Sequence, residues 1–181
     1  MNVELQDLRR LAPLPNMLDR GKLAQKYSLA IRDKVKSWCA VIAPITNAAS
    51  PETRQKLLGV EGVHDGEADL FGLLFENPNY RLLSSDKTAM RSLCRDPALV
   101  PIYERLCGRV ICSESILLAL LETVGIRALA TSIAPLREHN GMLNAIFSMG
   151  ENTSEAHCRD GLSSYLAEMS RDLGASFLFK F

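Results

Sequence analysis

The sequence predicts a helix-rich α/β fold in which a small parallel sheet is flanked by helices. Most of the chain reads as helix, and two short apolar runs, Tyr80–Ser84 and Arg109–Cys112, read as buried strands. The segment between them is long enough for a helical crossover, which implies parallel pairing with a right-handed connection. Because two strands make a thin sheet, we expect a further strand from residues 41–42 or 177–181, unless the first strand is missing from this chain.

The first 58 residues are expected to be helical, with prolines marking the limits of the helices. Ser50 suits an N-cap, and Pro51 suits the first position of the helix that follows. The helices expected here are Val3–Leu11, Leu18–Tyr27, Ile31–Ile45 and Pro51–Leu58.

Helices alternate with the two strands in the rest of the chain. Asp65 is expected to cap the helix Gly66–Glu76, and Gly125 separates two apolar helices, Glu114–Val124 and Ile126–Pro135. Helices are also expected at Asp86–Cys94 and at 97–106. The tail Ser154–Leu173 is amphipathic and carries an apolar stripe of Leu162, Tyr165, Leu166, Met169 and Leu173.

This pattern predicts one α/β domain over residues 1–150, with N-terminal helices at 1–58 and a central core at 59–124. Residues 151–181 are expected to form a C-terminal helix packed on the same domain. A hydrophobic content of 47% is sufficient for a core. The longest apolar run, Ile116–Leu121, is too short to span a membrane, so we expect no membrane association.

Charge and cysteine usage favour a cytoplasmic protein that handles a polyanion. The net charge is zero, yet residues 1–36 hold eight basic and four acidic side chains, and residues 61–79 hold five acidic and no basic ones. The alternative is two ordinary solvated faces. The five cysteines are odd in number and lack CxxC spacing, so we expect free thiols in a reducing compartment and no disulfide.

Two acidic side chains are placed where they can converge on one cleft. Glu67 lies in the first turn of its predicted helix, and Asp86 follows the apolar run that ends at Ser84. Acids at a helix start and at a strand end can bind a divalent cation, with Asp69 as a further ligand. Each acid also has a structural explanation. Glu67 is stabilised by the positive end of the helix dipole, and Asp86 can accept a capping hydrogen bond at the start of the next helix. Asp69 can be an ordinary helix residue exposed to solvent.

A basic ridge is predicted beside these acids. Lys87, Arg91 and Arg95 recur every four residues in the helix that Asp86 opens, so they share one face. Such a ridge can bind nucleic-acid phosphates, although a solvated helix face has the same pattern.

The segments Asp65-Gly-Glu-Ala-Asp-Leu70 and Tyr80-Arg-Leu-Leu-Ser-Ser-Asp-Lys87 resemble the central motifs of PIN-like domains. The resemblance covers roughly Gly59–Val124, about a third of the chain. It implies that Glu67 is the acid of the helix and Asp86 the acid of the strand end, with Ser84 or Ser85 as the small hydroxyl residue near the metal. The implied activity is Mg²⁺- or Mn²⁺-dependent cleavage of RNA, often as a toxin that is held by a protein inhibitor, the antitoxin.

The chain departs from that family pattern at its start. PIN-like domains begin with a hydrophobic strand that ends in Asp, and the first forty residues show no such strand. The alternative to a ribonuclease is therefore a non-catalytic, PIN-derived interaction module. We expect weak cation binding and, because a sheet without its first strand has an open edge, association into a homodimer.

Overall fold

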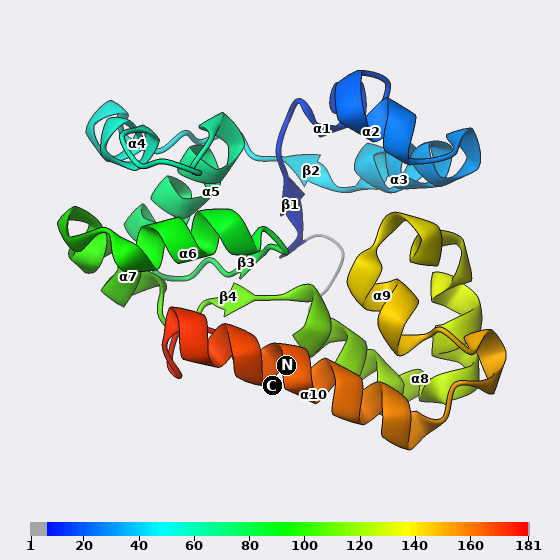
Figure 1. Ribbon diagram of the computed structural model, residues 1–181. Coiled ribbons are helices and arrows are strands. Elements are labelled where there is room, and N and C mark those ends of the chain that lie inside the picture. Colours follow the sequence, from blue (N-terminus) through cyan, green and yellow to red (C-terminus); the bar gives the residue numbers. More distant parts are fainter. Residues whose placement is uncertain (1–6, 181) are drawn as a thin grey trace. The chain divides into compact units, whose positions relative to one another are not determined.

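The computed structural model describes residues 7–180 and divides the chain into two compact units, Met1–Asn47 and Ala48–Phe181. Helices make up 68% of the protein, and each unit contains one small parallel sheet (Figure 1). The predicted class, helix-rich α/β with parallel strand pairing, is therefore confirmed. The division falls inside the segment in which a run of N-terminal helices was expected.

In the first unit, three helices lie between two short parallel strands along the sequence. Strand β1 pairs with β2, with Arg9 opposite Ala43 and Arg10 opposite Pro44. The Arg10 guanidinium strengthens this link, because its Nε donates to the carbonyl of Cys39 at 2.9 Å. The elements are β1 (Arg9–Arg10), α1 (Leu14–Met17), α2 (Gly21–Lys26), α3 (Leu29–Val41) and β2 (Ala43–Pro44).

The expected helices of this unit need three corrections. The helix predicted for Val3–Leu11 is wrong at Arg9–Arg10, where the backbone pairs with β2, and its first part, residues 3–6, lies outside the described residues. The helix predicted for Leu18–Tyr27 is interrupted because Arg20 is extended (φ −133°, ψ 156°). The third helix begins at Leu29 with Ser28 as its cap and ends at Val41, where the chain turns into β2.

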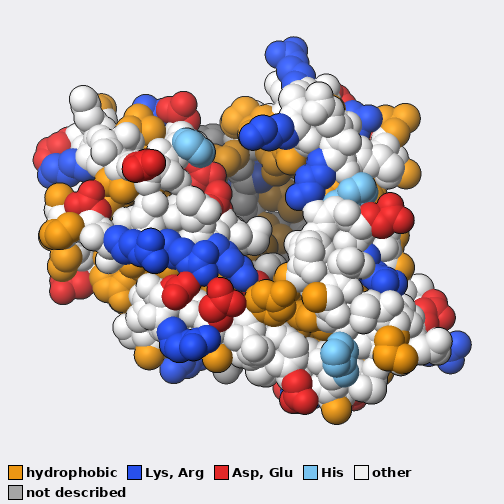
Figure 2. Space-filling view, viewed as in Figure 1, with side chains coloured by type: hydrophobic (Ala, Val, Ile, Leu, Met, Phe, Trp, Pro, Cys, Tyr) orange, Lys and Arg blue, Asp and Glu red, His pale blue; other side chains and the backbone are white. Residues whose placement is uncertain are grey.

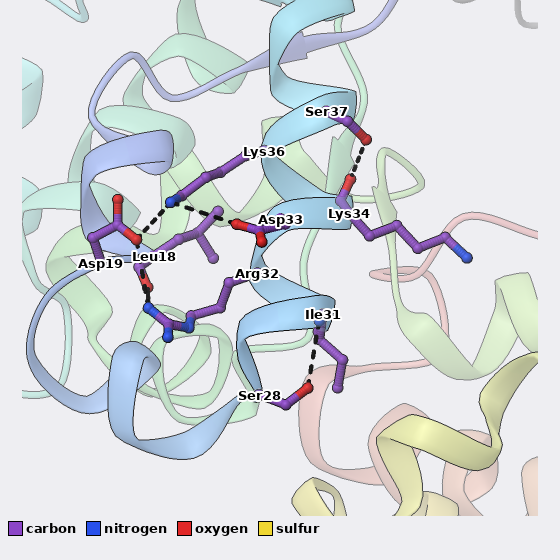
Figure 3. A network of polar contacts seen from close by, with 9 residues as sticks. All are labelled: Leu18, Asp19, Ser28, Ile31, Arg32, Asp33, Lys34, Lys36 and Ser37. Atoms are coloured by element: carbon purple, nitrogen blue, oxygen red, sulfur yellow. Dashed lines mark hydrogen bonds and ion pairs between the residues drawn. The ribbon is translucent and has the colours of Figure 1, made fainter.

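Polar contacts connect the helices of the first unit (Figure 3). Asp19 accepts hydrogen bonds from Lys36 Nζ at 2.6 Å and from an Arg32 nitrogen at 3.4 Å, and Lys36 lies 3.9 Å from Asp33. Within its described part, residues 7–47, the buried apolar side chains are Leu18 and Cys39. This unit therefore has little hydrophobic core.

In the second unit, β4 (Val110–Ile111) lies between two parallel partners. Leu82 of β3 (Leu82–Leu83) pairs with Val110, and Leu178 forms an isolated bridge to the same residue. Val110 contributes its carbonyl to the amide of Phe179 at 2.8 Å. Of the two segments expected to add a strand, 177–181 reaches this sheet only through the isolated bridge at Leu178, and the sheet has two strands among the described residues.

The helices of the second unit lie close to their predicted positions. Ser50, Asp86 and Ser154 each accept a hydrogen bond from the amide three residues later, and these caps fix the starts of α4, α6 and α10. The short helix α9 was not predicted. The bounds are α4 Pro51–Leu58, α5 Asp65–Glu76, α6 Lys87–Arg95, α7 Val100–Leu106, α8 Ser113–Ile133, α9 Gly141–Ile146 and α10 Glu155–Leu173, with 3₁₀ helices at Pro97–Leu99, Ala134–His139 and Gly150–Asn152.

The C-terminal helix α10 joins the two hydrophobic clusters of this unit. Met169 and Leu173 belong to the cluster around the sheet, and Leu162 belongs to the cluster formed with α8 and α9. These three side chains are at most 2% exposed, and α10 packs against α8 and α6 (Figure 1). The expectation that the apolar stripe of the tail packs on the α/β core is confirmed.

One helical stretch, Ser113–His139, is long and apolar enough to cross a membrane, judged by length and composition alone. Its mean hydropathy is 1.8 over the most apolar window, and 28% of that window is buried in the protein. Gly125 breaks the stretch, because its φ of 77° and ψ of 164° are not helical. Because a buried core helix can meet the same criteria, the expected absence of a membrane span stays a prediction.

Candidate functional site

Two acidic residues follow the carboxyl ends of the neighbouring strands β3 and β4. Asp86 is the N-cap of α6, three residues after β3, and Glu114 is the second residue of α8, three residues after β4. Because the two strands are parallel and hydrogen-bonded, their carboxyl ends meet at one edge of the sheet, where α/β proteins bind ligands. We call this place the acidic edge, defined by Asp86 and Glu114.

Asp86 caps helix α6, as the sequence predicted for its structural role. Its Oδ1 accepts a hydrogen bond from the amide of Ala89 at 2.9 Å, and its own amide donates to Ser84 Oγ at 3.2 Å. Ser84 thus stabilises the turn that brings Asp86 to the helix start. The second carboxylate oxygen, Oδ2, accepts no hydrogen bond from residues 7–180, so the cap leaves one oxygen available for a ligand.

Glu114 is the most deeply buried acidic side chain of the second unit, with 1% exposure. Lys87 Nζ lies 2.9 Å from its Oε1, and Ser113 Oγ donates to its Oε2 at 3.0 Å. Burial alone raises the pKa of this carboxyl, but the hydrogen bonds from Lys87 and the backbone and the charge of Lys87 leave the pKa below its usual value. Glu114 is therefore held as a charged carboxylate.

Sequence reasoning missed Glu114. The available signal was its position: Cys112-Ser-Glu114 follows an apolar strand and opens a helix, as Ser84-Ser-Asp86 does after the preceding strand. What the sequence did not reveal is its partner. The ammonium of Lys87 contacts Glu114 at 2.9 Å and lies 4.9 Å from the centre of the Tyr165 ring, and its binding to RNA stays a prediction.

Helix α5 presents its three N-terminal acids on different sides. Asp65 and Asp69 are four residues apart and both accept hydrogen bonds from Arg54 of α4, the latter at 2.8 Å from Arg54 Nε. Asp65 is the first helical residue, so the prediction that it caps the helix is wrong: His64 is the N-cap. Glu67 lies between them in sequence and points elsewhere, because residues two apart do not share a helix face.

Glu67 is half-buried and has no hydrogen bond or ion pair within residues 7–180. The loop before its helix contacts α6: a Cβ on Gly62 would lie 2.8 Å from Ser92 Oγ and 3.4 Å from Thr88 Cγ2. The loop that precedes α5 therefore packs against α6, which Asp86 caps. That Glu67 shares a cation with Asp86 stays a prediction, and Asp69 is already bound to Arg54.

The basic ridge on α6 is present, and two of its three members have acidic partners. Arg91 forms ion pairs with Glu168 and Asp172 of α10, the second at 2.5 Å. Figure 2 shows the row of basic side chains over α6, with acidic side chains directly below it over α10. Arg95 is exposed and forms no ion pair with the residues that the structure describes. The ridge is therefore partly neutralised inside the protein.

The acidic edge fits a divalent cation in the type of its ligands but not in their number. Carboxylate oxygens are suitable ligands for Mg²⁺ or Mn²⁺, which need about six ligands including water. Within residues 7–180, no group of three or more His, Cys, Asp or Glu side chains is gathered to hold a metal ion. A cation here would depend on water and on substrate oxygens for most of its ligands.

Three of the five cysteines are poorly suited to act as a nucleophile. All five are free, and burial raises the pKa of Cys112 and Cys158 and, together with the charge of Cys107, raises the pKa of Cys94 to about 12. A reactive cysteine needs a lowered pKa, because the thiolate is the nucleophile. Cys112 lies near the acidic edge, but its sulfur is buried and 3.2 Å from Ser115 Oγ.

Comparison of the chain with protein-family models, with curated proteins and with solved structures finds no match. The arrangement of residues around the acidic edge is therefore the basis for a functional proposal.

Proposed function

We propose that the chain is a PIN-like protein that cleaves RNA phosphodiesters with Mg²⁺ or Mn²⁺ at the acidic edge. The observation that supports the proposal is the position of Asp86 and Glu114 after two hydrogen-bonded parallel strands. Glu67, in the first turn of α5, has no partner among residues 7–180. A divalent ion at this place would supply an activated water and neutralise charge on the scissile phosphate.

The residues of the chain have separate roles in this proposal. Asp86 keeps one carboxylate oxygen for the ion while the other caps α6, and Glu67 has both oxygens available. Arg95 binds an RNA phosphate on the exposed end of the ridge. Arg91 and Lys87 can bind RNA only after breaking the ion pairs with their acidic partners, so we expect them to contribute less than Arg95 to the RNA-binding free energy.

Two kinds of protein partner belong to the same proposal. A protein inhibitor, as in toxin–antitoxin pairs, would cover the acidic edge with basic side chains. A second copy of the chain would pair with the outer edge of β3, which has no neighbouring strand among residues 7–180.

A second candidate function, a non-catalytic PIN-derived interaction module, is favoured by a different observation. Glu114 is already neutralised by Lys87, and no three ligands are gathered around it in the described residues. With so few fixed ligands, water and phosphate are not held in the geometry that in-line displacement requires.

A ribonuclease assay with matched variants separates the two candidates. Asp86→Asn keeps the helix cap, because Asn caps as well as Asp, but removes the charge. Asp96→Asn is the control: Asp96 caps the next helical segment, with Ala98 N at 2.8 Å, and does not follow a strand. We expect slow, Mn²⁺-dependent cleavage of single-stranded RNA that is lost in Asp86→Asn and kept in Asp96→Asn.

The other outcomes are equally informative. RNA binding without cleavage at any Mn²⁺ concentration identifies the interaction module. Cleavage that persists in Asp86→Asn removes the acidic edge as the catalytic site, and absence of both binding and cleavage removes RNA as the ligand.

A further inference from the structure

The first unit carries three lysines that have no acidic partner. Two other cations of α3 bond to Asp19, whereas Lys22, Lys26 and Lys34 are exposed and form no ion pair with residues 7–180. Figure 3 shows the side chain of Lys34 pointing away from the contacts around Asp19. The basic ridge on α6 differs, because two of its three cations pair with acids. The first unit therefore presents positive charge that is not neutralised inside the protein.

Two of these lysines lie against aromatic rings. The ammonium of Lys26 is 5.4 Å from the centre of the Tyr27 ring, and that of Lys34 is 6.0 Å from the centre of the Trp38 ring. Trp38 lies one turn after Lys34 on α3 and is 56% exposed, so much of its ring is open to a ligand. Proteins bind single-stranded nucleic acid with such pairs, because cations contact the phosphates while aromatic rings stack on the bases.

An open hollow in the same unit brings two cations together. It has a volume of about 560 Å³, and Arg20 and Lys22 line it with apolar side chains that include Met17 and Leu23. Among the described residues, no acidic side chain lines it. Apolar walls beside cations suit a nucleotide, which joins a base that stacks on such walls to a negative phosphate.

The first unit is small enough for one short strand to reach all of these groups. It is the compact unit Met1–Asn47, and a compact chain of that length has a radius of gyration of about 9–10 Å. Small domains that bind single strands contact roughly 4–16 nucleotides. The unit also has eight basic and four acidic side chains, so its electrostatic field attracts a polyanion.

We propose that the first unit binds single-stranded RNA, with Lys34 on a phosphate and Trp38 stacked on a base. The Lys26–Tyr27 pair and the hollow lined by Arg20 extend the contact along the strand. The inference rests on the proposed function only in taking RNA as the nucleic acid. It concerns binding alone, so it requires neither a metal ion nor the acidic edge.

An anionic membrane fits this surface less well than RNA does. A helix that lies in a membrane interface needs a continuous apolar face. The exposed residues of α3 include Asp33, Lys34 and Ser37 as well as Trp38 and Val41, so its exposed side is not continuously apolar.

The test is binding of the full chain to an oligouridine of about 12 nucleotides in EDTA, over a range of salt concentrations. Trp38 is the single tryptophan, so quenching of its fluorescence reports stacking directly, and anisotropy of labelled oligouridine gives the affinity. Trp38→Ala should weaken binding roughly 5- to 100-fold, the effect of losing one stacked base. Lys34→Met should weaken binding and reduce the slope of log affinity against log salt by about 0.7, the effect of losing one phosphate contact.

Two further variants keep the test specific. Lys36→Met is the matched control, because it removes the same charge from the same helix at a side chain already bonded to Asp19 at 2.6 Å. Its affinity should stay within about twofold of the wild type, with an unchanged salt slope, since a neutralised cation makes no phosphate contact. Trp38→Phe keeps a ring at this position and should recover most of the affinity that Trp38→Ala loses.

Three results would overturn the inference: oligouridine does not quench Trp38, Lys34→Met and Trp38→Ala bind as the wild type does, or Lys36→Met loses as much affinity as Lys34→Met. A blue shift of Trp38 emission on phosphatidylserine vesicles, without quenching by oligouridine, would assign the surface to a membrane instead. Binding with the expected pattern but no RNA cleavage in Mn²⁺ would support this inference and reject the proposed ribonuclease. Cleavage by the wild type with unchanged affinity in both variants would do the reverse.

Discussion

The two units of the chain are stabilised by different kinds of contact. The second unit buries apolar side chains in two clusters, around the sheet and between α8, α9 and α10, whereas residues 7–47 bury only Leu18 and Cys39 of theirs. The contacts within the first unit are largely polar and open to solvent, and the Asp19 side chain at their centre is 50% exposed. Burial provides most folding free energy, so stability is concentrated in the second unit.

The two units also differ in net charge, although the chain as a whole is neutral. Residues 1–47 carry eight basic and four acidic side chains, and residues 48–181 carry thirteen and seventeen. The net charge of zero is therefore the sum of a basic and an acidic unit whose charges cancel. A charge count over a whole chain hides a separation of this kind, and the separation is what bears on binding to a polyanion.

The largest expected effect comes from truncating the second unit. Truncation after Gly150 removes Leu162, Met169 and Leu173, whose burial contributes on the order of 5–9 kcal/mol, comparable with the whole stability of a domain. We expect an unfolded or insoluble product.

Deletion of residues 1–47 removes more residues yet should leave a cooperatively folding protein. Circular dichroism and urea denaturation of both products test this, and a folded 1–150 fragment would contradict it.

Single methionine substitutions should reproduce the contrast between buried and exposed sites. Met169 is 1% exposed and Met149 is 64% exposed, both in the second unit. Met169→Ala should lower the free energy of unfolding by about 2–5 kcal/mol because it leaves a cavity. Met149→Ala should change it by less than about 0.5 kcal/mol. Equal effects would show that the end of α10 is not part of the core in solution.

Acid should destabilise the second unit through Glu114. Its pKa is lower in the folded protein than the usual value of 4.5, so its ionic contribution is present above that pH and is lost as the pH falls through the lowered folded pKa. Glu114→Gln should cost roughly 1–3 kcal/mol at pH 7, because a buried partner of Lys87 is lost. The difference between wild type and variant should shrink in urea titrations below pH 4.5; a constant difference would reject the lowered pKa.

The smallest effect is expected at the exposed ion pairs of the first unit. The single tryptophan, Trp38, lies on α3 and is 56% exposed, so its fluorescence reports on this unit alone. Asp19→Asn should shift the urea transition seen by Trp38 only slightly, and leave unchanged the main circular dichroism transition, which comes from the more numerous helices of the second unit. The two transitions should not coincide even in wild type, and coincident ones would show that the units unfold together.

Local signals in the sequence were sufficient to place most of the second unit. Ser50 caps its helix as predicted, Asp86 caps α6 as one of its two predicted roles, and the spacing of Leu162, Met169 and Leu173 identified the buried face of α10. These features depend on residues within a few positions of each other, which a pattern in one sequence records.

The sequence could not supply features that depend on distant partners. β1 exists because residues 9–10 meet residues 43–44, and nothing in Arg9-Arg10 indicates a strand. Asp69 was predicted as a metal ligand, but in the structure its carboxylate forms an ion pair with Arg54 of α4, a partner that the sequence did not reveal. At the acidic edge, the sequence identified Asp86 through its strand end but gave no sign that Lys87 turns inward to Glu114.

The bridge between Val110 and Leu178 bears on how fast the second unit folds. It joins residues 68 positions apart, and Arg91 reaches still further along the chain to Glu168 and Asp172. Isolated helices form within about a microsecond. Contacts between such distant residues form more slowly, because the chain must first lose the entropy of closing a long loop. Until then β4 exposes one side of its backbone to other chains. Refolding should therefore be slow compared with helix formation and most efficient at low protein concentration.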